Sequence, residues 1–183
     1  MGVIMRYGQI RQYDIANGEG IRTSIFVTGC THCCYNCFNE EYQDFNAGQE
    51  WTDKETQLVV SYVKDPNCAG LTLLGGEPFQ NVDGMLAIVK AVREAAPEKP
   101  IWAYSGYVWD DIISDPSRRS LVEQIDILVD GRFVDELKDP SLRFRGSSNQ
   151  RIIDVQKSLK SGQVVIWDKL NDGKESYEQV KRE

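Results

Sequence analysis

The sequence predicts an α/β fold in which parallel strands and outer helices form an incomplete barrel of the TIM type. Short β-branched or aromatic runs alternate with segments of helical apolar spacing, which is typical of parallel sheets. The chain has 183 residues, whereas a complete eight-unit barrel needs about 250. Parallel strands with right-handed crossovers form either a doubly wound sheet or a barrel. An incomplete barrel of about five or six strand–helix units would fit, with the active site at the carboxyl ends of the strands.

The expected elements are short, and turn residues separate them. The expected strands are Ile21–Thr28, Leu71–Leu74, Ile101–Tyr104, Ile125–Val129, Arg151–Val155 and Gln163–Trp167. The expected helices are Asp53–Lys64, Val82–Ala95, Trp109–Ile113 and Arg118–Gln124. The first helix has the clearest start, because Thr52 and Glu55 have the spacing of a capping box.

Composition and charge exclude several classes of protein. The formal net charge of −7 argues against non-specific binding to nucleic acid, which requires basic patches. The amino-terminal segment lacks the apolar core of a signal peptide. No apolar run approaches the roughly 18 residues of a membrane span. We therefore expect a cytoplasmic protein, in a compartment where disulfides are rare.

Four of the five cysteines lie in the stretch GCTHCCYNCFN, residues 29–39. They are Cys30, Cys33, Cys34 and Cys37, and the fifth, Cys68, is expected to be structural. The stretch is compatible with a disulfide knot, a zinc site or an iron–sulfur cluster. The odd number of cysteines and the cytoplasmic location both disfavour disulfides.

The spacing of these cysteines disfavours zinc as well. A structural zinc ion needs four converging ligands, but adjacent Cys33 and Cys34 tend to point apart, and His32 faces the same crowding. The alternative spacing Cys30-x3-Cys34-x2-Cys37 leaves Cys33 as a small buried hydrophobic residue. Three thiolates would leave one iron of a [4Fe–4S] cluster open to a substrate or cofactor.

The loops after the first four expected strands all carry unusual residues. They contain, in chain order, the cysteines, Gly75-Gly76-Glu77-Pro78, Ser105-Gly106-Tyr107 and Asp130-Gly131-Arg132. Each of the last three, taken alone, is also explained by ordinary turn formation. In a parallel sheet, however, these loops share one edge, and that common location favours a functional site.

Cys-x3-Cys-x2-Cys after the first strand and Gly-Gly-Glu-Pro after the second resemble the radical S-adenosylmethionine superfamily. The match extends to IANGEGIR, YSGY, LVDGRF and FRGSSNQRIID. Over roughly residues 5–168, the chain resembles the glycyl-radical-enzyme activases that serve the anaerobic ribonucleoside-triphosphate reductase. The segment Arg145–Arg151 selects this branch. The resemblance makes residues 1–168 a radical S-adenosylmethionine domain and residues 169–183 a polar tail.

The resemblance implies an oxidoreductase with one [4Fe–4S] cluster per chain and S-adenosyl-L-methionine as cofactor. A flavodoxin or similar electron donor is expected to reduce the cluster. In this family, cleavage of S-adenosylmethionine yields a 5′-deoxyadenosyl radical, which takes hydrogen from a glycine of the reductase and leaves a glycyl radical there. The alternatives are a radical enzyme acting on a small molecule or on another glycyl-radical enzyme, and a zinc-binding interaction module.

The expected site residues also follow from the resemblance. Cys30, Cys34 and Cys37 are expected to bind the cluster. The residues expected to contact S-adenosylmethionine are Asn36, Cys37, Phe38, Gly75, Gly76, Glu77, Pro78, Ser105 and Asp130. Gly75 and Gly76 admit close backbone approach, Glu77 orients its loop or accepts a bond from the ammonium, and Phe38 stacks on adenine. No general acid–base pair is required, because the cofactor carries the chemistry.

Two further features each have two interpretations. Arg143, Arg145 and Arg151 concentrate positive charge late in the chain, either to recognise the cofactor carboxylate or the reductase, or as ordinary surface ion pairs. His32 lies between cluster ligands, where it either supports the loop by packing and hydrogen bonding or binds the metal itself.

Overall fold

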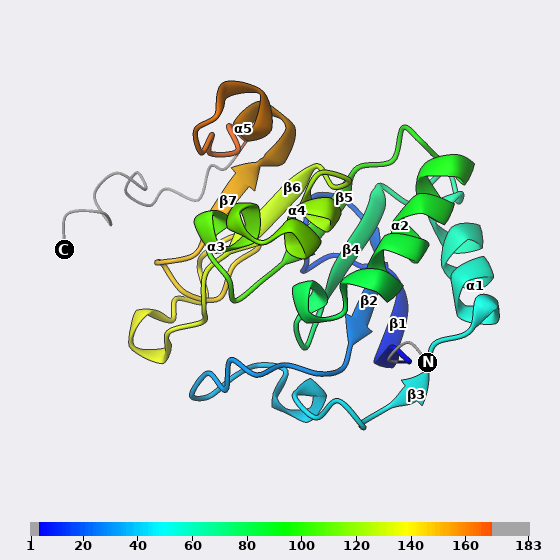
Figure 1. The fold of residues 1–183 in the computed structure, drawn as a ribbon, viewed down its shortest axis with the longest axis horizontal. Helices are drawn as coiled ribbons and strands as arrows, with labels where there is room; N and C mark the ends of the chain where they lie inside the picture. Colours follow the sequence, from blue (N-terminus) through cyan, green and yellow to red (C-terminus); the bar gives the residue numbers. More distant parts are fainter. Residues whose placement is uncertain (1–3, 170–183) are drawn as a thin grey trace.

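The computed structural model describes residues 4–169, which form a mixed seven-stranded sheet of order β3-β1-β2-β4-β5-β6-β7 (Figure 1). The strands are β1 (Arg6–Asp14), β2 (Arg22–Val27), β3 (Gln49–Glu50), β4 (Gly70–Gly75), β5 (Ile101–Tyr104), β6 (Ile127–Asp130) and β7 (Arg151–Asp154). The helices are α1 (Asp53–Val63), α2 (Val82–Ala95), α3 (Trp109–Ser114), α4 (Pro116–Val122) and α5 (Val155–Ser161). Short 3-10 turns lie at Glu40–Tyr42, Pro78–Gln80 and Asp135–Leu137.

The centre of the sheet is parallel, and its margins are antiparallel. Strands β2, β4, β5 and β6 pair in parallel, so their carboxyl ends share one edge as predicted. Strands β1, β3 and β7 run antiparallel to their neighbours. The α/β class is therefore confirmed. The partial barrel is not confirmed, because the sheet is open and ends at β3 on one side and β7 on the other.

Helices α1 to α4 cover one face of this sheet (Figure 1). This arrangement follows from right-handed crossovers between parallel strands that are added in one direction. Every second strand residue points into the core beneath these helices. The buried residues of this core include Ile25, Leu73, Ala103 and Leu128 from the strands and Val59, Val89, Ile112 and Leu121 from the helices.

Several predicted elements match the structure closely. Helix α2 and strand β5 have the predicted bounds, and α1 begins with the predicted capping box of Thr52 and Glu55. Helix α4 begins at Pro116, earlier than predicted, because Asp115 caps it by accepting a hydrogen bond from the Arg118 N–H.

Other predictions were wrong at the two ends of the chain. Strand β7 occupies almost the predicted span, but it is antiparallel and adds no barrel unit. Residues 163–167 do not form a strand, and only an isolated bridge joins Ile166 to Ile153. Strand β1 and helix α5 were not predicted. The expected polar tail lies almost wholly outside the described residues.

A buried arginine joins the first loop of the chain to the sheet. Arg22 is 1% exposed. It donates hydrogen bonds to Thr72 Oγ1 at 2.8 Å and to three backbone oxygens, those of Glu19, Leu71 and Pro100. Burial lowers the pKa of Arg22 to about 10, so the guanidinium stays charged at neutral pH. These bonds hold the loop of residues 15–21 against the sheet.

None of the helices within residues 4–169 combines the length and the apolar character that a membrane span requires. The described part of the chain therefore contains no candidate spanning helix.

Replacing Arg22 with Met is expected to lower the free energy of unfolding by at least about 3 kcal/mol, because four acceptors lose a charged donor inside the protein. The matched control is Arg119→Met, which removes an exposed ion pair with Glu123 and should cost about 0.5 kcal/mol or less. Urea unfolding of both variants measures the difference. Equal losses would show that the Arg22 contacts do not support the fold.

Candidate functional site

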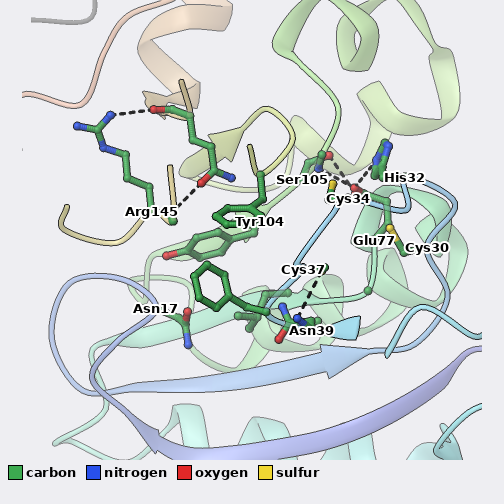
Figure 2. A pocket seen from close by; sticks show the side chains of 18 of the residues that line it. Asn17, Cys30, His32, Cys34, Cys37, Asn39, Glu77, Tyr104, Ser105 and Arg145 are labelled. Carbon is green, nitrogen blue, oxygen red and sulfur yellow. Dashed lines mark hydrogen bonds and ion pairs between the residues drawn. The ribbon is translucent and has the colours of Figure 1, made fainter. Parts of the chain in front are cut away.

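A cavity of about 470 Å³ lies on the sheet face opposite helices α1 to α4. Phe26, Leu74 and Tyr104 line it from the strands, and their neighbours along each strand point into the helix-covered core. The loops after β2, β4, β5 and β6 form most of the remaining lining, and Ala16 and Asn17 from the loop after β1 also contribute. Figure 2 shows the cysteines, His32 and Glu77 toward one end of the cavity, with Asn17 and Arg145 toward the other.

Three of the four clustered cysteines line this cavity, and they are the three selected by their spacing. Cys30, Cys34 and Cys37 all contribute to its wall. Cys33 does not line the cavity and is exposed, in a left-handed backbone conformation with φ of 51°. The expectation that Cys33 is buried was therefore wrong: the turn that directs Cys34 inward directs Cys33 outward.

The fifth cysteine lies away from the cavity. Cys68 is 2% exposed, and its thiol contacts Thr23 Oγ1 at 3.5 Å and donates to the Gly70 carbonyl. These contacts agree with the structural role that was expected for it.

Two of the cavity thiols, those of Cys30 and Cys34, are weaker acids than an ordinary cysteine. Burial raises the pKa of Cys30 to about 11, and the negative charges of Glu77, Cys34 and Cys37 add to this effect. Burial also raises the pKa of Cys34, with a further contribution from Cys37. Since thiolates are the metal-binding form, loading of this site must release protons.

The two glycines after β4 lie against the cysteine loop. Gly75 has φ of 102°, and a Cβ there would lie 2.6 Å from the Val27 oxygen. A Cβ at Gly76 would lie 2.7 Å from the Gly29 oxygen and from the Tyr42 oxygen. The Gly76 N–H donates to the Val27 carbonyl at 2.6 Å. The missing side chains therefore allow two backbone segments of the site to touch.

The other residues expected from the resemblance fall into two groups. Glu77 and Ser105 are buried and line the cavity, as does Phe38, which is 62% exposed at the mouth. Asn36 and Pro78 are not part of the lining, and the Asn36 amide donates to Asp135 instead.

Asp130 also lies outside the lining, although it is 1% exposed. Its two carboxylate oxygens accept hydrogen bonds from Arg151 Nε and Nη2, and one of them also accepts from the Trp109 N–H. The pairing raises the pKa of Arg151. This bidentate pair joins the end of β6 to the start of β7, and the carboxylate also holds the start of α3.

The three late arginines have different positions. Arg143 is exposed and lies over the Phe144 ring, and Arg151 pairs with Asp130. Arg145 is 9% exposed and lines the cavity, where it donates to the carbonyls of Ser148 and Gln150. Arg145 is therefore a buried residue of the cavity wall and not a surface residue.

Sequence reasoning did not identify several residues of the wall. Asn17 lines the cavity from the loop after β1, and its amide donates to Asp14 at 2.7 Å. Tyr104 lies at the end of β5, and its hydroxyl donates to the Phe144 carbonyl. Asn17 belongs to the IANGEGIR stretch, which was the available signal, but nothing in the sequence directs its side chain inward.

The donor set suits a cluster better than a single ion. All five cysteines are free thiols. Within residues 4–169, no three side chains of His, Cys, Asp or Glu converge closely enough to bind one metal ion. A tetrahedral zinc site needs such convergence. In a four-iron cluster each thiolate binds a different iron, so the three cavity cysteines need not converge on one atom.

Comparisons with known proteins point the same way. A family model described as a 4Fe-4S single cluster domain matches residues 16–153. The chain is 41% identical to the anaerobic ribonucleoside-triphosphate reductase-activating protein of Haemophilus influenzae, over 81% of this chain and 97% of that protein. It is 40% identical to the protein of the same name from Escherichia coli K12, over 80% of this chain and 96% of that protein. It is 35% identical to the protein of the same name from phage T4, over 81% of this chain and 93% of that protein.

Replacing Gly76 with Ala is expected to lower the free energy of unfolding by about 2 kcal/mol, because the new Cβ forces two backbone segments apart. The separation should also speed labelling of Cys30 and Cys34 by a thiol reagent. Gly162→Ala is the control, since Gly162 has φ of 72° and nothing within 4 Å of a new Cβ. The control should cost about 1 kcal/mol through backbone strain alone and leave labelling unchanged. Unchanged labelling in Gly76→Ala would contradict the proposed contact.

Proposed function

Because the chain belongs to the family of anaerobic ribonucleoside-triphosphate reductase-activating proteins, we propose that it places a glycyl radical on such a reductase. The proposed cofactors are a [4Fe–4S] cluster and S-adenosyl-L-methionine. The observation that carries the proposal is the position of Cys30, Cys34 and Cys37 on one cavity, while Cys33 points away from it.

The three cavity cysteines would hold three irons and leave the fourth without a protein ligand. When bound, the cluster and S-adenosylmethionine supply one-electron reductive cleavage and abstraction of a hydrogen atom from a glycine of the partner. A flavodoxin or a similar protein is the proposed electron donor. The proposed catalytic domain comprises residues 1–168, since β7 and α5 belong to the same fold as the cavity.

The protein is proposed to orient the cofactor and to exclude water from the cavity. The Gly75-Gly76 backbone and Ser105 line the cavity beside the cysteines and are proposed to meet the amino-acid end of the cofactor. Phe26, Leu74 and Phe144 make much of the remaining lining apolar. Such a wall excludes water, which protects a reactive radical from side reactions.

The aromatic residue at the mouth is the proposed adenine contact. The Phe38 ring lies 4.9 Å from the Phe133 ring and under the Lys138 ammonium, and both phenylalanines line the cavity. The tilted contact with Phe133 and the Lys138 ammonium hold the Phe38 ring at the cavity mouth, where the adenine is proposed to stack on it. Asn36 and Pro78, which lie beside the site without lining it, are proposed to shape the two loops rather than to touch the cofactor.

Replacing Cys34 with Ala is expected to reduce bound iron to background after anaerobic reconstitution, because one of the three thiolates is lost. Cys33→Ala is the matched control from the adjacent position, and it should keep the iron, the absorbance of the cluster and the electron paramagnetic resonance signal of its reduced form. Loss of the cluster in Cys33→Ala would overturn the assignment of ligands.

The activity is tested by reconstituting the protein with iron and sulfide, reducing it with dithionite and adding S-adenosylmethionine. The expected products are methionine and 5′-deoxyadenosine. With an anaerobic ribonucleoside-triphosphate reductase present, a glycyl-radical doublet should develop on the reductase in electron paramagnetic resonance.

Three results would argue against the proposal. Cofactor cleavage without a radical on the reductase would favour a radical enzyme with another substrate. If a cluster forms but S-adenosylmethionine is not cleaved, the cluster has a structural role. If the purified protein contains one zinc per chain and no iron, a zinc-binding interaction module is favoured.

A further inference from the structure

Glu77 is a buried carboxylate that joins three loops of the site. It is 1% exposed. Its Oε1 accepts hydrogen bonds from the Phe79 N–H at 3.0 Å and the Ser105 hydroxyl at 2.9 Å. Its Oε2 accepts from the Gly106 N–H at 2.8 Å and is 2.9 Å from His32 Nε2. A carboxylate has about four acceptor positions, so these four contacts occupy all of them.

His32 is the partner that the cysteine loop contributes to this group. Its side chain is 5% exposed, and Figure 2 shows it pointing to Glu77 beside Cys30 and Cys34. The ring lies edge-on to Tyr107 at 4.5 Å between centroids. A Cβ at Gly106 would lie 2.4 Å from the His32 ring, so the ring occupies the space that this glycine leaves open.

A second link holds the same part of the loop. Gln80 Oε1 accepts from the Thr31 N–H at 3.0 Å, and Gln80 Nε2 donates to Thr31 Oγ1 and to the Tyr107 hydroxyl. Both links run from the loops after β4 and β5 to residues 31 and 32. The segment between Cys30 and Cys34 is therefore held by side chains from outside the cysteine loop.

We infer that His32 is a positioning residue that fixes Cys30 and Cys34 relative to the glycine loop by donating from Nε2 to Glu77. Glu77 in turn has no acceptor position left for the cofactor ammonium and serves as the anchor of three loops. The inference deepens the proposed function, since it rests on the cysteine loop holding a cluster. Of the two interpretations of His32, support of the loop is the one that its burial and partners favour.

The test compares two replacements of His32 that separate hydrogen bonding from packing. His32→Gln places an amide N–H near the position of Nε2, whereas His32→Leu fills the space without a donor. After anaerobic reconstitution, His32→Leu should release iron to a chelator about tenfold faster than the wild type, which is the typical effect of losing a partner that orients metal ligands. His32→Gln should stay closer to the wild type than to His32→Leu.

Two further variants give the matched comparisons. Tyr35→Leu changes an exposed residue of the same loop and should leave the rate of iron release unchanged. Gly106→Ala displaces the His32 ring without altering it and should speed iron release as His32→Leu does. The reverse pattern, with His32→Leu like the wild type and His32→Gln impaired, would mean packing alone and would overturn the inference. So would unchanged release in Gly106→Ala.

Hydrogen exchange of the metal-free protein makes the test independent of the proposed function. The Gly106 N–H, which donates to Glu77, should exchange faster in His32→Leu than in the wild type or in Tyr35→Leu. If the wild type binds no cluster, the proposed function fails, but the exchange measurement still decides whether His32 anchors Glu77. Unchanged exchange at Gly106 would overturn the anchoring role, even if iron binds.

Discussion

The candidate site depends on the close approach of two backbone segments. The Gly76 N–H and the Glu77 N–H donate to the carbonyls of Val27 and Gly29, so the loop after β4 lies directly against the start of the cysteine loop. No side chain fits at Gly75 or Gly76 in this arrangement. Because the two strands are neighbours and parallel, their ends already lie side by side, and the glycines convert this proximity into contact. The buried position of Glu77 follows, and with it the links to the loop after β5.

One face of the sheet packs against the helices, and the other lines the cavity. The face under helices α1 to α4 is filled with aliphatic residues and stabilises the fold by burying apolar surface. The opposite face carries Phe26, Leu74 and Tyr104 under the cavity. That face is enclosed by the loops of residues 15–21 and 131–150. Buried Arg22 donates to the Glu19 carbonyl of the first loop and to the Leu71 carbonyl of β4. Arg145 donates to the carbonyls of Ser148 and Gln150 in the second loop. The loops thus cover the face that a second layer of helices would cover in a sheet with helices on both sides.

Much of the parallel centre could be predicted from the sequence, whereas the margins could not. Helix α2 and strand β5 have strong apolar periodicity and clear turn residues at their ends, and their bounds matched. Strand β1 reads RYGQIRQYD and is polar on most positions, because an antiparallel margin needs little burial. The direction of β7 is set by its pairing with β6 and by the Asp130–Arg151 ion pair, which are tertiary contacts. In the site, spacing selected the three inward cysteines, but the outward position of Cys33 depends on a left-handed residue that no local pattern specifies.

Charge and geometry together decide which metal suits the cavity. Burial and the nearby charge of Glu77 raise the pKa of the Cys30 thiol to about 11, which makes its proton harder to lose when a metal binds. Four donors already occupy the acceptor positions of the Glu77 carboxylate. Glu77 therefore has no free position with which to bind a metal. The positive charge of the metal must therefore balance the three new thiolates. A single zinc ion supplies such charge, but it also demands ligands that converge on one point, and within residues 4–169 no such group exists. A four-iron cluster distributes its charge over several irons and binds each thiolate at a different iron, and the 4Fe-4S single cluster domain model that matches residues 16–153 favours this group over a single ion.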